Sequence, residues 1–175
     1  MSSVRAMRTL FLLRHAKSSW SDPTLADQER PLSARGRRDA KRIARHLAQL
    51  AIEPDLVLCS PAQRTRETLD LVRPALDAST SMIFEVELYG ASADTLLDQL
   101  RGVPDGVESV LLIGHNPGVQ DLALCLASEG VELNRLEEKF PTAALAILAV
   151  PKVTWAQLSE ADAVLEAFVV PRQLD

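Results

Sequence analysis

The stretch Leu10-Phe11-Leu12-Leu13-Arg14-His15 carries the strongest signal for the fold. From Thr9 onward, four consecutive apolar residues are typical of a short strand buried on both faces, as in a parallel sheet. Similar short apolar segments recur at residues 55–59, 82–86 and 109–113. We therefore expect a central, mainly parallel sheet, in which the first strand ends at Arg14 and His15.

Helical segments alternate with these strands along the chain. Residues 33–50 have apolar side chains at helical spacing behind Ser33, a favourable N-cap. Ser60 followed by Pro61 is typical of a helix start and predicts a helix to about residue 77. Further helices are expected at residues 93–100 and 118–127, and two mutually antiparallel strands at residues 143–150 and 163–170, connected around residues 153–160. This order predicts an α/β fold, a three-layer sandwich with a mainly parallel central sheet, helices on both faces and an antiparallel C-terminal strand pair.

Composition narrows the class of protein. The 175 residues suit one domain, and 47% hydrophobic with 25% charged residues is ordinary for a globular chain. A formal net charge of -5 argues against a nucleic-acid-binding surface. Only Cys59 and Cys125 are present, which indicates neither a disulfide framework nor a Cys/His zinc site. Residues 1–7 read as a loose lead-in, and no segment has the length of a signal-peptide core or a membrane span, so we expect a cytoplasmic protein without a membrane partner.

Cationic and titratable side chains gather at the ends of the predicted strands. Arg14 and His15 follow the first strand, Arg64 follows the second, and His115 follows the fourth. In open α/β sheets, ligands bind outside the carboxyl ends of the strands. We therefore expect these four residues to form one cationic pocket, whereas His46 lies away from the apolar face of its helix.

Such a pocket suits phosphoryl chemistry. Two guanidinium groups can donate paired hydrogen bonds to phosphoryl oxygens, and their charge favours the neutral form of a nearby imidazole. A neutral His15 can attack phosphorus and form a covalent phosphohistidine that water later hydrolyses. Positioning and charge stabilisation supply most of the catalysis, so no cofactor and no metal are expected.

Several separated blocks resemble the histidine phosphatase superfamily, and most closely its SixA-type phosphohistidine phosphatases. These blocks are Leu-Leu-Arg-His-Ala-Lys-Ser-Ser-Trp ending at Trp20, then Arg30-Pro31-Leu32, Arg35-Gly36, Ser60-Pro61-Ala62-Gln63-Arg64 and Gly114-His115-Asn116-Pro117-Gly118. They occur in the family's order over about two thirds of the chain. Ala16 stands where many superfamily members have glycine, and alanine is common there in SixA-like members.

The resemblance implies a role for each pocket residue. His15 is the implied nucleophile, Arg14 and Arg64 bind the phosphoryl group, and His115 helps to stabilise it. Glu87 resembles the position of the family's general acid, and a solvated glutamate near a turn is the alternative. The resemblance also implies a single histidine-phosphatase-like domain over residues 1–175. Its substrate would be a phosphorylated protein, such as a histidine phosphotransfer domain, or a small phosphate ester.

Three other interpretations follow from the same residues. A cysteine phosphatase needs Cys-x5-Arg, but Thr65 stands six residues after Cys59, which excludes that chemistry. A small-molecule phosphomonoesterase or a phosphoglycerate-mutase-like enzyme would use the same pocket, although the short segment at residues 86–92 favours an open rim suited to a protein substrate. A phosphoprotein-binding module without catalysis would use the arginines but would not need His15.

Overall fold

The structure is built on one seven-stranded sheet with the strand order β3-β2-β4-β1-β6-β7-β5. The computed structural model describes residues 7–151 and 154–174. β1 to β4 run parallel to one another, and β6 runs antiparallel to both of its neighbours, β1 and β7. The strands are β1 (Arg8–Arg14), β2 (Leu56–Cys59), β3 (Ser81–Phe84), β4 (Ser109–Gly114), β5 (Ala127–Gly130), β6 (Leu145–Val150) and β7 (Ala163–Val169). The predicted parallel sheet with an antiparallel C-terminal pair is thereby confirmed.

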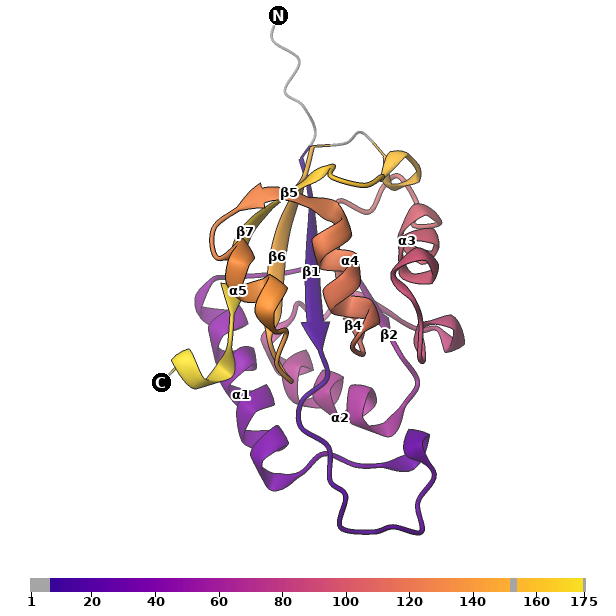
Figure 1. The fold of residues 1–175 in the computed structure, drawn as a ribbon, viewed down its shortest axis with the longest axis vertical. Coiled ribbons are helices and arrows are strands. Elements are labelled where there is room, and N and C mark those ends of the chain that lie inside the picture. The colour runs from indigo at the N-terminus through magenta and orange to yellow at the C-terminus, as the bar shows by residue number, and fades with distance from the viewer. Residues whose placement is uncertain (1–6, 152–153, 175) are drawn as a thin grey trace, which may run out of the picture.

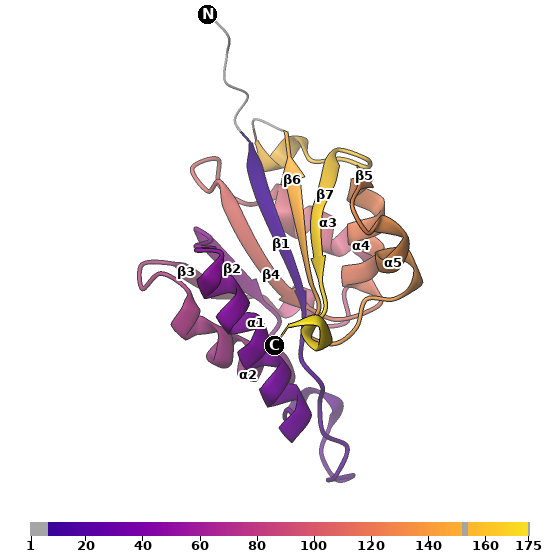
Figure 2. The ribbon, with the colours of Figure 1, turned by 90° about the vertical axis from the view of Figure 1, so that its left-hand side faces the viewer.

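Helices cover both faces of this sheet (Figures 1 and 2). One face packs against α1 (Ala34–Gln49) and α2 (Gln63–Val72), and the other against α3 (Ala93–Arg101), α4 (Gly118–Leu126) and α5 (Leu133–Glu138). In the described part of the chain, five single 3-10 turns complete the elements: η1 (Asp27–Glu29), η2 (Arg73–Ala75), η3 (Val86–Leu88), η4 (Trp155–Gln157) and η5 (Pro171–Gln173). The predicted α/β three-layer arrangement is correct.

The sequence of β1 explains why this strand lies in the middle of the sheet. Leu10 and Leu12 belong to the core beneath α3 and α4, whereas Phe11 and Leu13 belong to the core beneath α1 and α2. Side chains alternate between the two faces of a strand, so an uninterrupted apolar run can be buried only where both faces are covered. Polar residues therefore enter this strand only at its ends, and the carboxyl end leads directly to His15.

The first helix begins where the sequence predicts. Ser33 accepts a hydrogen bond from the backbone N–H of Gly36 at 3.0 Å and so caps α1. Ala40, Ile43 and Leu47 are fully buried on its inner face. The N-cap also ties the helix to the strand end, because Ser33 donates its own backbone N–H to the carbonyl of Lys17 at 2.8 Å.

The second helix begins later than predicted. Ala62, rather than Ser60, is the N-cap of α2. The Ser60 carbonyl accepts a hydrogen bond from the Thr65 hydroxyl, and the Ser60 hydroxyl bonds to His115. Because these contacts occupy both oxygens of Ser60, that residue links β2 to the pocket instead of starting the helix. The regular helix also ends at Val72, before Pro74, and not at residue 77.

Two elements were not predicted at all. β5 and α5 lie between α4 and β6 along the chain. In the sheet, β5 pairs with β7 and forms one edge. β5 has three exposed residues out of four, so it carries no apolar pattern that would indicate a strand. The third strand also ends at Phe84, two residues earlier than predicted, because residues 86–88 turn into η3.

Two expectations concern parts of the chain that are only partly described. The predicted lead-in at residues 1–7 lies outside the described residues except for Met7, and the predicted connection at residues 153–160 begins outside them. Within the described ranges, none of the helices combines the length and the apolar character that crossing a bilayer requires.

Candidate active site

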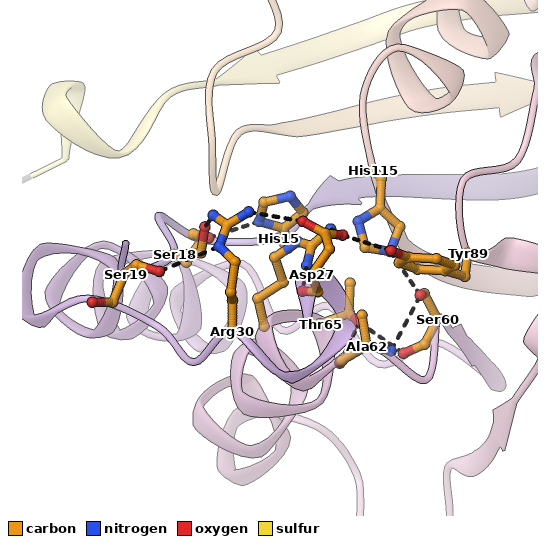
Figure 3. A network of polar contacts seen from close by, with 12 residues as sticks. His15, Ser18, Ser19, Asp27, Arg30, Ser60, Ala62, Thr65, Tyr89 and His115 are labelled. Carbon is orange, nitrogen blue, oxygen red and sulfur yellow. Dashed lines mark hydrogen bonds and ion pairs between the residues drawn. The ribbon is translucent and has the colours of Figure 1, made fainter. Parts of the chain in front are cut away.

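His15 and His115 lie side by side at the carboxyl ends of β1 and β4. The two strands are parallel neighbours with Arg14 opposite Gly114, and the backbone N–H of His15 donates to the Gly114 carbonyl at 3.0 Å. The imidazole centroids are 5.1 Å apart, and each histidine is only 8% exposed. Figure 3 shows both rings at the same pocket. The two histidines that end predicted strands are thus brought together by the sheet.

The tautomer of His15 is fixed by its own backbone surroundings. Nδ1 lies 2.7 Å from the carbonyl oxygen of Ala16. Because a carbonyl oxygen can only accept a hydrogen bond, Nδ1 carries the ring proton. Nε2 therefore keeps its lone pair, which is the requirement for a nucleophile.

The surroundings also keep this ring neutral. Burial lowers the pKa of His15 from 6.5 to about 3, although the hydrogen bond to Ala16 acts in the opposite direction. The neighbouring His115 and the positive charges of Arg64 and Arg14 contribute to this lowering of the pKa. At neutral pH the ring is consequently unprotonated and able to attack an electrophile.

A hydrogen bond to a serine fixes the ring of His115. Its Nε2 lies 2.7 Å from the Ser60 hydroxyl, while its Nδ1 is buried and has no partner among the described residues. Burial first, and then the charge of Arg64, lower the pKa of His115 to about 4. An unpaired buried ring nitrogen is costly, and a ligand in the pocket would supply the missing partner.

The two predicted arginines face the same space. Arg64 is 8% exposed, and Arg14 is half-buried with its Nε buried and unpaired within the described part of the chain. Burial, followed by the charge of Arg64, lowers the pKa of Arg14. With His15 they line a cavity of about 240 Å³, whose other lining residues are Lys17, Ser18, Trp20, Arg30 and Thr142. We refer to this space, together with the His115 ring beside His15, as the phosphate pocket, after the ligand that the sequence predicts for it.

An acidic residue that the sequence did not single out occupies the centre of the polar network. Asp27, in η1, accepts hydrogen bonds from Arg64 at 3.0 Å, from Arg30 at 2.9 Å and from the Tyr89 hydroxyl at 2.6 Å (Figure 3). Its backbone carbonyl also accepts from Arg64 at 2.7 Å. The Tyr89 hydrogen bond, followed by those from the arginines, lowers the pKa of Asp27 to about 2. Asp27 therefore orients Arg64 as a permanently ionised carboxylate.

The loop that carries Asp27 is anchored over the pocket by further contacts. The guanidinium of Arg30 stacks on the indole of Trp20 with its central carbon 3.2 Å from the ring centroid. Arg30 also hydrogen-bonds to the Ser18 hydroxyl and to the Ser19 carbonyl. Trp20 itself remains 72% exposed at the rim. The sequence signals for this arrangement were the block that ends at Trp20 and the Arg-Pro-Leu block that begins at Arg30.

A buried threonine connects the residue after His15 to α2. The hydroxyl of Thr68 accepts a hydrogen bond from the backbone N–H of Ala16 at 3.0 Å and donates to the carbonyl of Arg64 at 2.7 Å. The same side chain thus fixes the residue after His15 and the helix turn that carries Arg64. In the sequence this position looks like one more residue on the inner face of a helix.

Glu87, the predicted general acid, lies at the surface of the protein. Glu87 is exposed in η3, and among the described residues it forms no hydrogen bond or ion pair. Tyr89, the single tyrosine of the chain, instead reaches the pocket and meets His115 edge-on with centroids 5.5 Å apart. The role of Glu87 remains a prediction, and Tyr89 is the pocket residue of this segment.

Other candidate chemistries lack the required groups. Burial raises the pKa of Cys59 to about 12, which leaves the thiol protonated and unsuited to attack phosphorus. Asn116 donates to the Phe140 carbonyl and to Gln120, so it holds the turn after β4. Over residues 7–151 and 154–174, no group of three or more His, Cys, Asp or Glu side chains has the arrangement of a metal site.

Comparisons with known proteins agree with this geometry. Residues 10–89 match the family model of the histidine phosphatase superfamily (branch 1). The protein Rv1276c of Mycobacterium tuberculosis is 38% identical over 164 residues, covering 91% of this chain and 100% of the relative.

Two solved structures have the same fold over nearly the whole chain. A protein from Nakamurella multipartitia assigned as phosphohistidine phosphatase SixA is 31% identical, with a TM-score of 0.81 over 94% of this chain and 96% of its own. A protein histidine phosphatase SixA complexed with tungstate is 25% identical, with a TM-score of 0.78 over 95% of this chain and 99% of its own.

Proposed function

Since the chain belongs to the histidine phosphatase superfamily and is of the SixA type, we propose that it hydrolyses phosphohistidine on proteins, with His15 as the nucleophile. It is a phosphatase of the class that uses a histidine nucleophile. The observation that carries the assignment to His15 is the hydrogen bond from Nδ1 to the Ala16 carbonyl, which leaves Nε2 free beside Arg14 and Arg64.

The reaction proceeds in two displacements. In the first, the Nε2 lone pair of His15 forms a bond to phosphorus while the bond from phosphorus to the substrate nitrogen breaks, and the electron pair leaves with the substrate imidazole. In the second, water forms a bond to the same phosphorus and loses a proton to the solvent, while the bond from phosphorus to Nε2 breaks and its electron pair returns to Nε2. Inorganic phosphate is released and the neutral imidazole is regenerated.

The arginines and His115 stabilise the group in transfer. Arg14 and Arg64 would donate to the three equatorial oxygens, where charge accumulates, through the guanidinium N–H groups that their bonds to Phe140 and Asp27 leave free. The buried and unpaired groups of the pocket, Arg14 Nε and His115 Nδ1, would gain partners when the phosphoryl oxygens enter. A tetrahedral oxyanion is the natural occupant, and tungstate, bound by one SixA-type relative, is such an oxyanion.

The state of the pocket carboxylate favours phosphohistidine over alkyl phosphates. An alkoxide leaving group needs a proton from a general acid, but the pKa of Asp27 near 2 keeps this carboxylate ionised at neutral pH. Phosphohistidine carries a second ring nitrogen that water can protonate before the bond breaks, so the imidazole leaves neutral. The hypothesis that Glu87 protonates leaving groups of high pKa is tested by Glu87→Gln: slower turnover of an alkyl phosphate would support it, and near-normal turnover across pH would remove Glu87 from the mechanism.

The test is phosphate release from a phosphohistidyl phosphotransfer domain, measured beside simple phosphomonoesters. Native protein is compared with His15→Ala and with His46→Ala, since His46 lies on α1 outside the pocket. Release from phosphohistidine that His15→Ala abolishes and His46→Ala retains is the expected result. Release from small esters alone would make the protein a metabolite phosphatase, and binding without any turnover would make it a phosphoprotein-binding module.

A further inference from the structure

A second cavity of about 300 Å³ lies beside the phosphate pocket, between α1, the segment before β6 and the C-terminal turn η5. η5 lies against α1 in both ribbon views (Figures 1 and 2). Five cationic side chains and a single carboxylate line this cavity, although the whole chain has a formal net charge of -5. We call it the cationic cleft; its charged residues are Arg35, Arg38, Asp39, Arg42, Lys139 and Arg172.

The cleft has more positive charge than its own carboxylate can neutralise. Asp39 is buried and is shared between Arg35 at 3.5 Å and Arg42 at 3.1 Å. Within the described ranges, the exposed side chains of Arg38, Lys139 and Arg172 form no ion pair. Like charges held this close repel one another, and an anionic partner would relieve that repulsion.

Three arginines of the cationic cleft lie on the same face of α1. Arg35, Arg38 and Arg42 stand three and seven residues apart along α1, which places them on one face. The other three cations of α1, Arg37, Lys41 and Arg45, do not line the cleft. Half of the positive charge of this helix therefore faces η5, where Lys139 and Arg172 add to it.

The cationic cleft adjoins the place where the phosphoryl group is transferred. Thr142 lines both the cleft and the phosphate pocket. The next residue, Ala143, donates its backbone N–H to the carbonyls of Arg14 at 3.1 Å and His15 at 3.0 Å. A macromolecule that presents a phosphorylated side chain to His15 can therefore lay its adjacent surface over this cleft.

We propose that the cationic cleft docks a carboxylate-rich surface of the phosphorylated protein substrate. This inference rests on the proposed function, because it needs a protein as the substrate. The cations come from three separate elements, α1, the residue 139 segment and η5, so they suit several carboxylates spread over a surface. Docking here compensates for the overall negative charge of the chain, which would otherwise repel an acidic partner.

The test compares two phosphohistidine peptides that differ only in flanking charge, one with four aspartates and one with four asparagines. We expect native protein to show a kcat/KM about ten-fold higher for the acidic peptide at low salt, with the preference lost by about 0.3 M NaCl. Equal kcat/KM values for the two peptides in native protein would overturn the docking proposal and leave the phosphatase intact. No turnover of either peptide would overturn the proposed function, and the docking inference with it.

Variants then locate the effect. Arg38→Glu/Arg172→Glu should abolish the preference for the acidic peptide through KM, while kcat/KM for the asparagine peptide stays within about two-fold of native. Arg73→Glu/Arg101→Glu makes the same change in net charge away from the cleft and should retain the preference. Docking at this cleft would be refuted if both double variants lost the preference for the acidic peptide to the same extent. It would also be refuted if kcat/KM of the cleft variant fell equally for the two peptides.

Discussion

The two buried imidazoles of the phosphate pocket should make the stability of the fold depend steeply on pH below neutrality. Burial lowers the pKa of His15 to about 3 and that of His115 to about 4, from 6.5 for an exposed histidine. In the unfolded chain both rings bind protons as the pH falls through 6.5, whereas the folded protein does not bind them until far lower. Stability is therefore complete above pH 6.5 and decreases as the pH falls toward 4.

The size of the effect follows from these values. Between pH 7 and pH 5, the linkage relation gives a loss of about 2 kcal/mol in the free energy of unfolding for each ring, and about 4 kcal/mol for both. The lowered pKa of Asp27, about 2, places its titration below this interval, so it adds nothing there. A loss of this size is a large fraction of the stability of an ordinary domain.

Urea unfolding followed by circular dichroism at pH 7 and pH 5 measures this loss. His15→Asn and His115→Asn should each keep about half of the native difference between the two pH values, and the double variant should keep almost none. Leu12→Val is the control, because it weakens the core beneath α3 and α4 but retains both rings. It should lower the free energy of unfolding equally at the two pH values.

Two outcomes would refute the reasoning. A native loss below about 1 kcal/mol between pH 7 and pH 5 would mean that the rings are protonated in the folded state at acid pH. An unchanged native slope in the double variant would mean that other groups carry the pH dependence. In either case the claim that burial lowers the pKa of the two rings would be refuted.

Three further predictions concern the surroundings of the nucleophile. Thr68→Val removes the acceptor of a buried backbone N–H and should lower the free energy of unfolding by about 1–3 kcal/mol together with kcat; unchanged urea unfolding would contradict it. Gly36→Ala places a Cβ 2.1 Å from the Lys17 carbonyl oxygen and should destabilise by about 1–3 kcal/mol, and a native melting curve would contradict the close contact. Tyr89→Phe removes the largest cause of the lowered pKa of Asp27, so this carboxyl should titrate at higher pH by NMR, and an unmoved titration would contradict that cause.

The sequence was sufficient to predict the framework, since local patterns encode it. The apolar run from Leu10 to Leu13 requires a strand covered on both faces, and Ser33 starts α1 by bonding to a backbone N–H three residues away. It also predicted which side chains meet. Parallel strands end at one edge of the sheet, so His15 and His115 became neighbours although 100 residues separate them.

Only the tertiary structure decided the contacts that hold the pocket in shape. Asp27 lies in a loop without periodicity and reaches Arg64, 37 residues further along the chain, because the loop folds back over the strand ends. Ser60 carries a helix-start signal, but His115 and Thr65 take its oxygens and delay the helix. A turn of η3 directs Tyr89 to the pocket and leaves Glu87 at the surface. Local sequence sets backbone preferences over a few residues, whereas these hydrogen bonds join groups that only the assembled sheet brings within reach.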